Sequence, residues 1–245
     1  MARPWETIAR GRCGEGPLEL RRRGPDDFLI TLSGRVLMNS RARRSEVALA
    51  ELGCASLRGT RGARVLVGGL GMGLTLRAAL DSLGPDARVV VAELNPVIAE
   101  WCMGPLAELN RAALADARVG LEIGDIAHAI EHAARLGGAA RFDVILLDLY
   151  GGPAPGRAGR EDPCFGSRAL ARSHAALRPG GALAVWAERP DRDFEGRLRR
   201  AGFAVERSRP GRGGLRHAVY VARPGPLPAP TRRRVELSGE TASEP

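Results

Sequence analysis

Lysine is absent from this sequence, so its basic side chains other than histidine are all arginine. The chain has 37 arginines against 28 acidic residues, and its formal net charge with neutral histidine is +9. The arginines form short groups spread along the chain, at 21–23, 41–44, 197–200 and 232–234. Five Phe, three Trp and two Tyr are present, and none alternates with arginine as a base-stacking surface requires. This scatter argues against a nucleic-acid partner, and the missing lysine excludes a P-loop nucleotide site.

Cysteine is sparse and long apolar runs are missing. Cys13, Cys54, Cys102 and Cys164 lie far apart without a CxxC pair, which argues against a zinc site and provides no disulfide framework. No segment approaches the run of about eighteen apolar residues that a transmembrane helix needs. Residues 1–6 have no apolar stretch behind their charge and do not resemble a signal peptide. These absences predict a cytoplasmic protein with no metal and no membrane partner.

The first part of the chain has the pattern of a β-hairpin followed by a helix. Alternating segments between 18 and 40 are separated by turns at 24–27 and 33–34, as in short antiparallel strands. Apolar residues then recur at helical spacing over 45–57, with Ser45 as the N-cap.

From residue 64 onward, short apolar strands alternate with helices. This alternation is typical of a parallel sheet with right-handed crossovers, and continuous apolar strands fit burial on both faces. The predicted strands cover 64–67, 89–92, 119–123, 142–147, 182–186, 203–206 and 218–221. The predicted division is an N-terminal β-hairpin region at 1–44, a Rossmann-like nucleoside-binding domain at 45–223 and a disordered tail at 224–245, which starts with Pro and Gly.

Glycines or acids follow four successive strands, where ligands bind in an open α/β sheet. Glu93 and Leu94 follow the second strand, Asp125 and Ile126 the third, and Asp148 the fourth. An acid about twenty residues past the glycines can accept hydrogen bonds from both hydroxyls of a ribose. Each feature alone also fits a structural role, as a tight turn or a helix cap, but together and in register they predict a nucleoside site. Its glycines, which follow the first strand, are Gly68, Gly69, Gly71 and Gly73.

The glycine spacing distinguishes between nucleosides. Residues 69–73 read GxGxG, whereas the NAD fingerprint is GxGxxG. The acid after the third strand can also accept a hydrogen bond from an adenine amino group. The expected donor substrate is therefore S-adenosylmethionine or its decarboxylated form.

From about Gly34 to Ala187 the chain resembles the spermidine synthase-like, or polyamine aminopropyltransferase-like, family. The matching motifs are the turn at 32–34, the loop at 65–73, VAELNP at 91–96, GD at 124–125, FDVILLD at 142–148 and LRPGG at 177–181. The resemblance implies an α/β fold with the Rossmann-like sheet of class I methyltransferases. It also implies transfer of an aminopropyl group in polyamine biosynthesis and a homodimer formed through the N-terminal hairpin.

Several residues on which the reaction of that family depends are replaced. The acid that holds the aminopropyl amine corresponds to Gly71, the catalytic base to Gly151 and a glutamine after the hairpin to Leu37. The Tyr-His pair of the family is missing, while Glu46 matches the acid that follows it. Loss of a carboxylate that pairs a desolvated ammonium costs about 2–5 kcal/mol. The prediction is therefore a spermidine synthase-like transferase with a changed, small acceptor, which moves either an aminopropyl or a methyl group.

The candidate groups on the acceptor side are Asp148, Tyr150, Glu188 and His174. Tyr150 either covers the sulfonium or packs as a loop aromatic. His128 and His132 share a helix face but lack a third ligand, so a solvated face is expected. The loop at 151–160 is either a lid or a surface connection. Two alternatives to a transferase stay open: a non-catalytic protein that binds adenosyl nucleosides and, less favoured, a nucleic-acid-binding protein.

Overall fold

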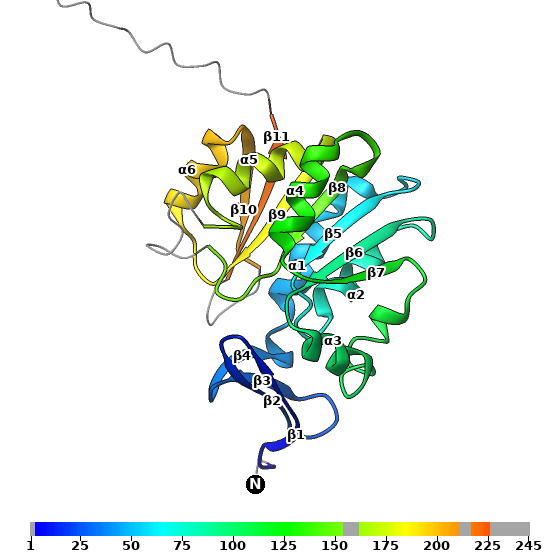
Figure 1. Cartoon of the computed structure of the whole chain (residues 1–245), viewed down its shortest axis with the longest axis vertical. Helices are drawn as coiled ribbons and strands as arrows, with labels where there is room; N and C mark the ends of the chain where they lie inside the picture. The colour runs from blue at the N-terminus through cyan, green and yellow to red at the C-terminus, as the bar shows by residue number, and fades with distance from the viewer. Residues whose placement is uncertain (1–2, 154–161, 211–216, 226–245) are drawn as a thin grey trace, which may run out of the picture.

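The structure, a computed structural model, describes residues 3–153, 162–210 and 217–225. These residues form an antiparallel N-terminal sheet and a larger, mostly parallel sheet covered by helices (Figure 1). The predicted α/β class is confirmed. The tail predicted from residue 224 starts too early, because Pro224 pairs with Phe203 as the last residue of a strand. The rest of that tail, from 226, and the part of the predicted lid from 154 lie outside the described residues. Within the described part, no helix is long and apolar enough to cross a bilayer.

The N-terminal sheet has four strands in the order β1-β2-β3-β4 and is larger than the predicted hairpin. Its strands are β1 (Glu6–Cys13), β2 (Gly16–Arg22), β3 (Phe28–Leu32) and β4 (Arg35–Asn39). The sequence prediction missed β1, which pairs with β2 along its whole length. No residue of β1 is fully buried, so this edge strand lacks the apolar alternation by which strands are recognised.

The larger sheet has seven strands in the order β10-β11-β9-β8-β5-β6-β7. The run from β9 through β8, β5 and β6 to β7 is parallel, while β11 lies antiparallel between β9 and β10. The strands are β5 (Arg64–Gly68), β6 (Arg88–Glu93), β7 (Val119–Ile123), β8 (Phe142–Leu147), β9 (Leu177–Ala187), β10 (Phe203–Ser208) and β11 (Ala218–Pro224).

The predicted turn at 179–181 lies inside β9. Pairing between β8 and β9 jumps from Phe142↔Leu177 to Val144↔Ala182. The residues between Leu177 and Ala182 therefore bulge out of the ladder, with Gly180 in the left-handed region at φ 77°. The turn residues thus interrupt the ladder without ending the strand.

Three helices cover each face of the larger sheet. They are α1 (Arg44–Gly53), α2 (Leu74–Ser82) and α3 (Pro96–Met103) on one face, and α4 (Ile126–Leu136), α5 (Ser167–Ala176) and α6 (Arg192–Arg200) on the other. The helix predicted over 45–57 ends at Gly53 and is followed by a 3₁₀ turn, Ala55–Leu57. The helix that begins at Pro96 ends at Met103 rather than at 109.

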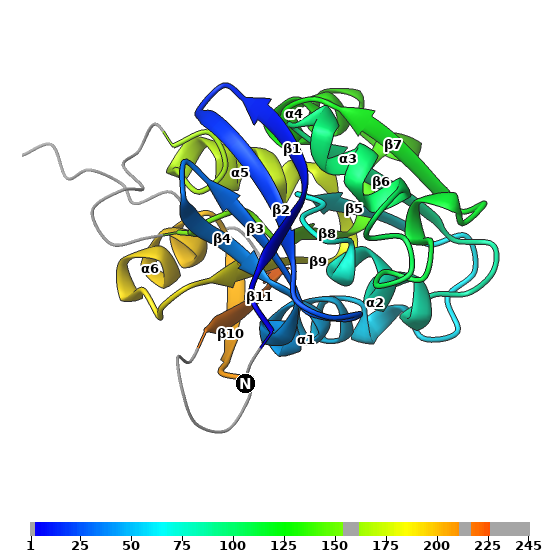
Figure 2. The same cartoon turned by 90° about the horizontal axis from the view of Figure 1, so that it is seen from below.

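The N-terminal sheet is joined to the larger one by a shared core. Leu18, Leu20 and Ile30 belong to the same buried cluster as Leu49 of α1 and Ile98 of α3. Seen from below, the N-terminal sheet lies across the α/β domain that contains the larger sheet (Figure 2). Its strands are thereby held over one edge of that domain.

Helix α1 lies so close to the sheet that Gly53 has no room for a side chain. A Cβ atom at Gly53 would lie 2.5 Å from Leu146 Cδ2 and 3.0 Å from Ala184 Cβ, both in the core. We expect Gly53→Ala to lower the free energy of unfolding by about 1–3 kcal/mol through overpacking, measured by urea denaturation.

Gly196→Ala is the matched control. Gly196 lies inside α6, where a Cβ would meet only the flexible end of Arg200, at 3.3 Å. We expect this change to raise stability by about 0.5–1 kcal/mol because glycine is a poor helix former. Equal effects of the two changes would show that α1 does not pack this closely.

Candidate functional site

The carboxyl ends of the parallel strands bring the predicted site residues to one edge of the sheet. Strands β7, β6, β5 and β8 are neighbours in that order, about 4.8 Å apart. Asp125, Glu93, the glycine loop at 68–73 and Asp148 therefore follow one another across this edge. After β5 the chain forms β6 and β7 on one side of β5 and then crosses over to form β8 on its other side. The strand order therefore reverses between the glycine loop and Asp148, the place where open α/β sheets bind their ligands.

The glycine loop passes close to the backbone of Asp148. Gly69, Gly71 and Gly73 all have left-handed backbones, at φ 83°, 53° and 78°. A Cβ at Gly69 would lie 2.5 Å from the Asp148 carbonyl oxygen, and one at Gly71 would lie 2.5 Å from Sδ of Met38 in β4. These positions accept glycine because other residues rarely adopt this conformation and because their neighbours leave no space.

Glu93 joins the glycine loop to the turn that follows β6. Its side chain is 6% exposed. The backbone amide of Leu70 donates to Oε2 and that of Asn95 to Oε1, both at 2.8 Å. A carboxylate has about four acceptor sites, so each oxygen keeps one for another donor. The exposed Leu94 stands beside it.

Asp125 is the N-cap of α4, so the structural role considered for it is real. Its Oδ1 accepts the Ala127 amide at 2.8 Å, and the side chain is half-buried. The next residue, Ile126, is buried, and its Cγ1 would lie 2.8 Å from a Cβ at Gly68. Gly68 therefore provides space for Ile126 between β5 and α4.

Asp148 lies in surroundings that favour its protonated form. The Thr75 hydroxyl, in the first turn of α2, donates to Asp148 Oδ2 at 2.5 Å. The pKa of Asp148 is raised to about 7, chiefly by burial and then by the charge of Glu46, while the Thr75 hydrogen bond and the charge of His217 act to lower it. A carboxyl group with a pKa near neutrality can accept a proton at physiological pH.

Glu46 is a second buried carboxyl group at this edge. It lies in the first turn of α1 and is 9% exposed. The Ser45 hydroxyl donates to Oε2 at 2.8 Å, but burial outweighs this bond and raises the pKa of Glu46. The charge of Glu46 in turn raises the pKa of Asp148.

Two residues of this cluster were missed by the sequence analysis. Thr75 follows the last glycine by two positions, and its place in the first turn of the next helix was the available signal. His217 gave no signal, because it reaches Asp148 only through the insertion of β11 beside β9. Its ring packs against Trp186 of β9, with centroids 4.9 Å apart.

Comparison with solved structures identifies the fold. A spermidine synthase in complex with the transition state analogue AdoDATO superposes with a TM-score of 0.66 at 18% identity, covering 88% of this chain and 71% of the other. The spermidine synthase from Thermotoga maritima superposes with a TM-score of 0.67 at 18% identity, covering 88% and 72%. This chain has the spermidine synthase fold. No family model and no curated protein matches the sequence.

The spermidine synthase fold is shared with methyltransferases. Human methyltransferase-like protein 13 in complex with SAH superposes with a TM-score of 0.54 at 20% identity, covering 76% of this chain and 82% of the other. The prediction of a Rossmann-like sheet of the class I methyltransferase type, with an N-terminal β region, is confirmed.

Besides Asp148, the acceptor-side candidates were Tyr150, Glu188 and His174. Two of these three lie at the edge formed by the carboxyl ends of the parallel strands, the carboxyl edge. Tyr150 is 55% exposed, and Glu188 is exposed just after β9. His174 lies at the opposite edge, because α5 ends immediately before β9 begins. Its ring packs against Phe203, with centroids 5.0 Å apart. Inclusion of His174 among the acceptor-side candidates was wrong.

His128 and His132 are exposed on α4, in agreement with a solvated face. Among the residues that the structure describes, no group of three or more His, Cys, Asp or Glu side chains is arranged to hold a metal ion.

Proposed function

We propose that the carboxyl edge binds S-adenosylmethionine, or its decarboxylated form, and that the protein transfers an alkyl group from the sulfonium to a small acceptor. The observation that carries this proposal is the order of groups across the edge. Across the edge, the groups follow one another in the order Asp125, Glu93, glycine loop and Asp148. This order matches the order of adenine, ribose and sulfonium along the ligand. Two proteins of this fold are bound to AdoDATO or SAH, which supports an adenosyl ligand.

In the proposed complex, adenine lies by Asp125, Leu94 and Ile126, and the ribose hydroxyls bind Glu93. The free acceptor sites on both Glu93 oxygens support this placement. The sulfonium then points toward the glycine loop and Asp148, at the switch point of the sheet.

The transfer itself needs one proton acceptor. A lone pair of the acceptor attacks the carbon bound to the sulfonium, and the carbon–sulfur bond breaks to leave a neutral thioether. The proton that the acceptor loses passes to Asp148, whose pKa near 7 suits a general base. Tyr150 and Glu188 lie past the ends of the adjacent strands, where they contact the acceptor.

The surroundings of Gly71 favour S-adenosylmethionine over the decarboxylated donor. Position 71 carries no carboxylate, and the Met38 thioether fills the space beside it. The tail of S-adenosylmethionine has no net charge, whereas that of the decarboxylated donor is a cation. An unpaired cation is costly to bury against an apolar thioether.

The test is calorimetric titration with S-adenosylmethionine, the decarboxylated donor and methylthioadenosine, followed by labelled transfer to a panel of small amines, alcohols and acids. We expect methylthioadenosine and S-adenosylmethionine to bind, and one acceptor class to be alkylated. Binding without any turnover would identify the protein as a nucleoside binder. Failure of all three to bind would refute the nucleoside site.

Substitutions of the two nucleoside-facing acids give a sharper test. Glu93→Ala and Asp125→Ala should each weaken methylthioadenosine binding by about 1–3 kcal/mol, the cost of a lost hydrogen bond to a charged group. Glu100→Ala, an exposed acid of α3, is the control and should bind like the wild type. Unchanged affinity in both site variants would contradict the proposed orientation.

A further inference from the structure

The space between α1 and α2 contains a second candidate site, distinct from the carboxyl edge. A cavity of about 670 Å³ lies there, within the range of roughly 300–1,000 Å³ that small-molecule sites occupy. It follows α2 from its first residue, Leu74, to its last, Ser82. We call it the α1–α2 groove. Its apolar lining residues are Val47, Leu74, Ala78 and Leu109.

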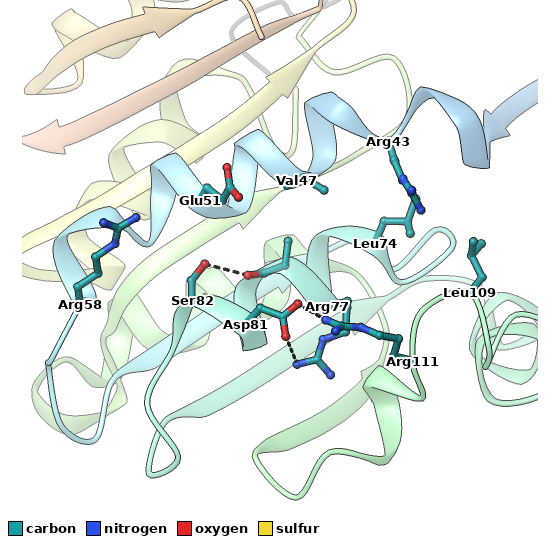
Figure 3. Close-up of a pocket in the computed structure, with 11 residues that line it drawn as sticks. Arg43, Val47, Glu51, Arg58, Leu74, Arg77, Asp81, Ser82, Leu109 and Arg111 are labelled. Atoms are coloured by element: carbon teal, nitrogen blue, oxygen red, sulfur yellow. Dashed lines mark hydrogen bonds and ion pairs between the residues drawn. The ribbon is translucent and has the colours of Figure 1, made fainter. Parts of the chain in front are cut away.

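The charged lining of the α1–α2 groove is mainly cationic. The lining contains four arginines but only two acids, Glu51 and Asp81, so two positive charges are in excess. Glu51 comes from α1, and Asp81 comes from α2, where its carboxylate points toward Arg77 and Arg111 (Figure 3). The arginines of the lining, which come from separate segments of the chain, are Arg43, Arg58, Arg77 and Arg111.

The two acids do not provide ion-pair partners for all four arginines. Arg77 and Arg111 both pair with Asp81, Arg77 at 2.7 Å, so two guanidinium groups share one carboxylate (Figure 3). Arg77 Nε is buried and has no hydrogen-bond partner in the described part of the chain. Arg43 and Arg58 are exposed and form no ion pair with any described residue. The groove therefore holds guanidinium donors that lack protein acceptors.

We propose that the α1–α2 groove binds a small organic phosphate, with the phosphate among Arg43, Arg77 and Arg111, which lie toward one end of the groove (Figure 3), and the carbon skeleton on the apolar lining. A phosphate monoester carries up to two negative charges near neutral pH, which matches the excess positive charge. Guanidinium groups bind phosphate through paired, charge-assisted hydrogen bonds. Neither adenosyl donor carries a phosphate, so this ligand is additional to the proposed transfer reaction.

The experiment is calorimetric titration of the full chain at an ionic strength of about 0.1 M with phenyl phosphate, and separately with inorganic phosphate. Phenyl phosphate joins an apolar ring to a dianion and contains no nucleoside. We expect it to bind more tightly than inorganic phosphate, because only the ester has a group for the apolar lining.

The variant Arg43→Glu should weaken phenyl phosphate binding by about tenfold or more, as loss of charge-assisted contacts implies. The control, Arg12→Glu, makes the same change in net charge at an exposed position of the N-terminal sheet. It should stay within about twofold of the wild type, because charges beyond the Debye length of about 10 Å are screened.

Three outcomes would overturn the proposal: no binding of phenyl phosphate at millimolar concentration, equal affinity for inorganic phosphate, or equal losses in the two variants. Thermal unfolding of both variants shows whether each is folded. Methylthioadenosine binding is measured on the same samples. Its absence from the wild type would refute the proposed function while leaving the phosphate result intact.

Discussion

Asp148→Asn is expected to slow alkyl transfer by about 10²–10⁴-fold, the usual contribution of a general base, with little change in nucleoside affinity. The amide cannot take the proton of the acceptor, yet its oxygen can still accept the Thr75 hydroxyl that now binds Asp148 Oδ2. Single-turnover transfer from labelled donor measures the first effect, and calorimetry with methylthioadenosine the second. An active Asn variant would show that the proton goes elsewhere.

The pH dependence separates this role from a structural one. Wild-type transfer should rise as pH increases through about 7, where Asp148 loses its proton, and the Asn variant should lack this step. Thr75→Val removes the hydrogen bond that lowers the pKa of Asp148. It should therefore move the midpoint of the wild-type profile to higher pH.

Stability should depend on pH through the same group. The carboxyl pKa is raised from 3.8 to about 7 by folding, so the unfolded chain releases its proton first as pH increases. The contribution of Asp148 to stability is therefore lost between about pH 4 and pH 7 and stays constant above that window. The Asn variant should be more stable than the wild type at pH 8, and this advantage should shrink toward pH 4. Glu46, whose pKa is raised as well, adds a slope of the same sign.

Gly69→Ala is expected to abolish nucleoside binding and to destabilise the fold. Its left-handed backbone costs a residue with a Cβ atom about 1–2 kcal/mol. Its Cβ would also lie 2.5 Å from the Asp148 carbonyl oxygen, a backbone atom that cannot rotate away. Overpacking of this kind costs about 1–3 kcal/mol and moves the glycine loop away from Asp148. Urea denaturation and methylthioadenosine titration measure the two effects.

Gly71→Ala is the matched variant in the same loop. It has the same left-handed strain, but the atoms it would meet, Sδ and Cε of Met38, are the end of a flexible side chain. We expect the strain cost alone and a smaller loss of nucleoside affinity. Equal behaviour of the two variants would mean that the approach of the loop to Asp148 is not required.

The sequence by itself determined the central strands and the residues at their carboxyl ends. Strands β7 and β8 begin and end where they were predicted. Glu93, Asp125 and Asp148 all lie at the expected edge. These features could be predicted because apolar runs, turn glycines and strand-end acids are local patterns, and because consecutive strands joined by helices become parallel neighbours.

Only the tertiary structure decided which side chains surround the glycine loop and Asp148 at the carboxyl edge. Met38 packs beside Gly71, and the charges of Glu46 and His217 act on the pKa of Asp148. Each of these interactions joins distant segments, and each depends on how the N-terminal sheet, α1 or β11 docks onto the central strands. Strand β1 escaped prediction for a related reason, since an edge strand held by backbone pairing needs no apolar pattern of its own. Local pattern therefore predicts which groups stand at the end of each strand, while packing sets which of them meet and how strongly they hold a proton.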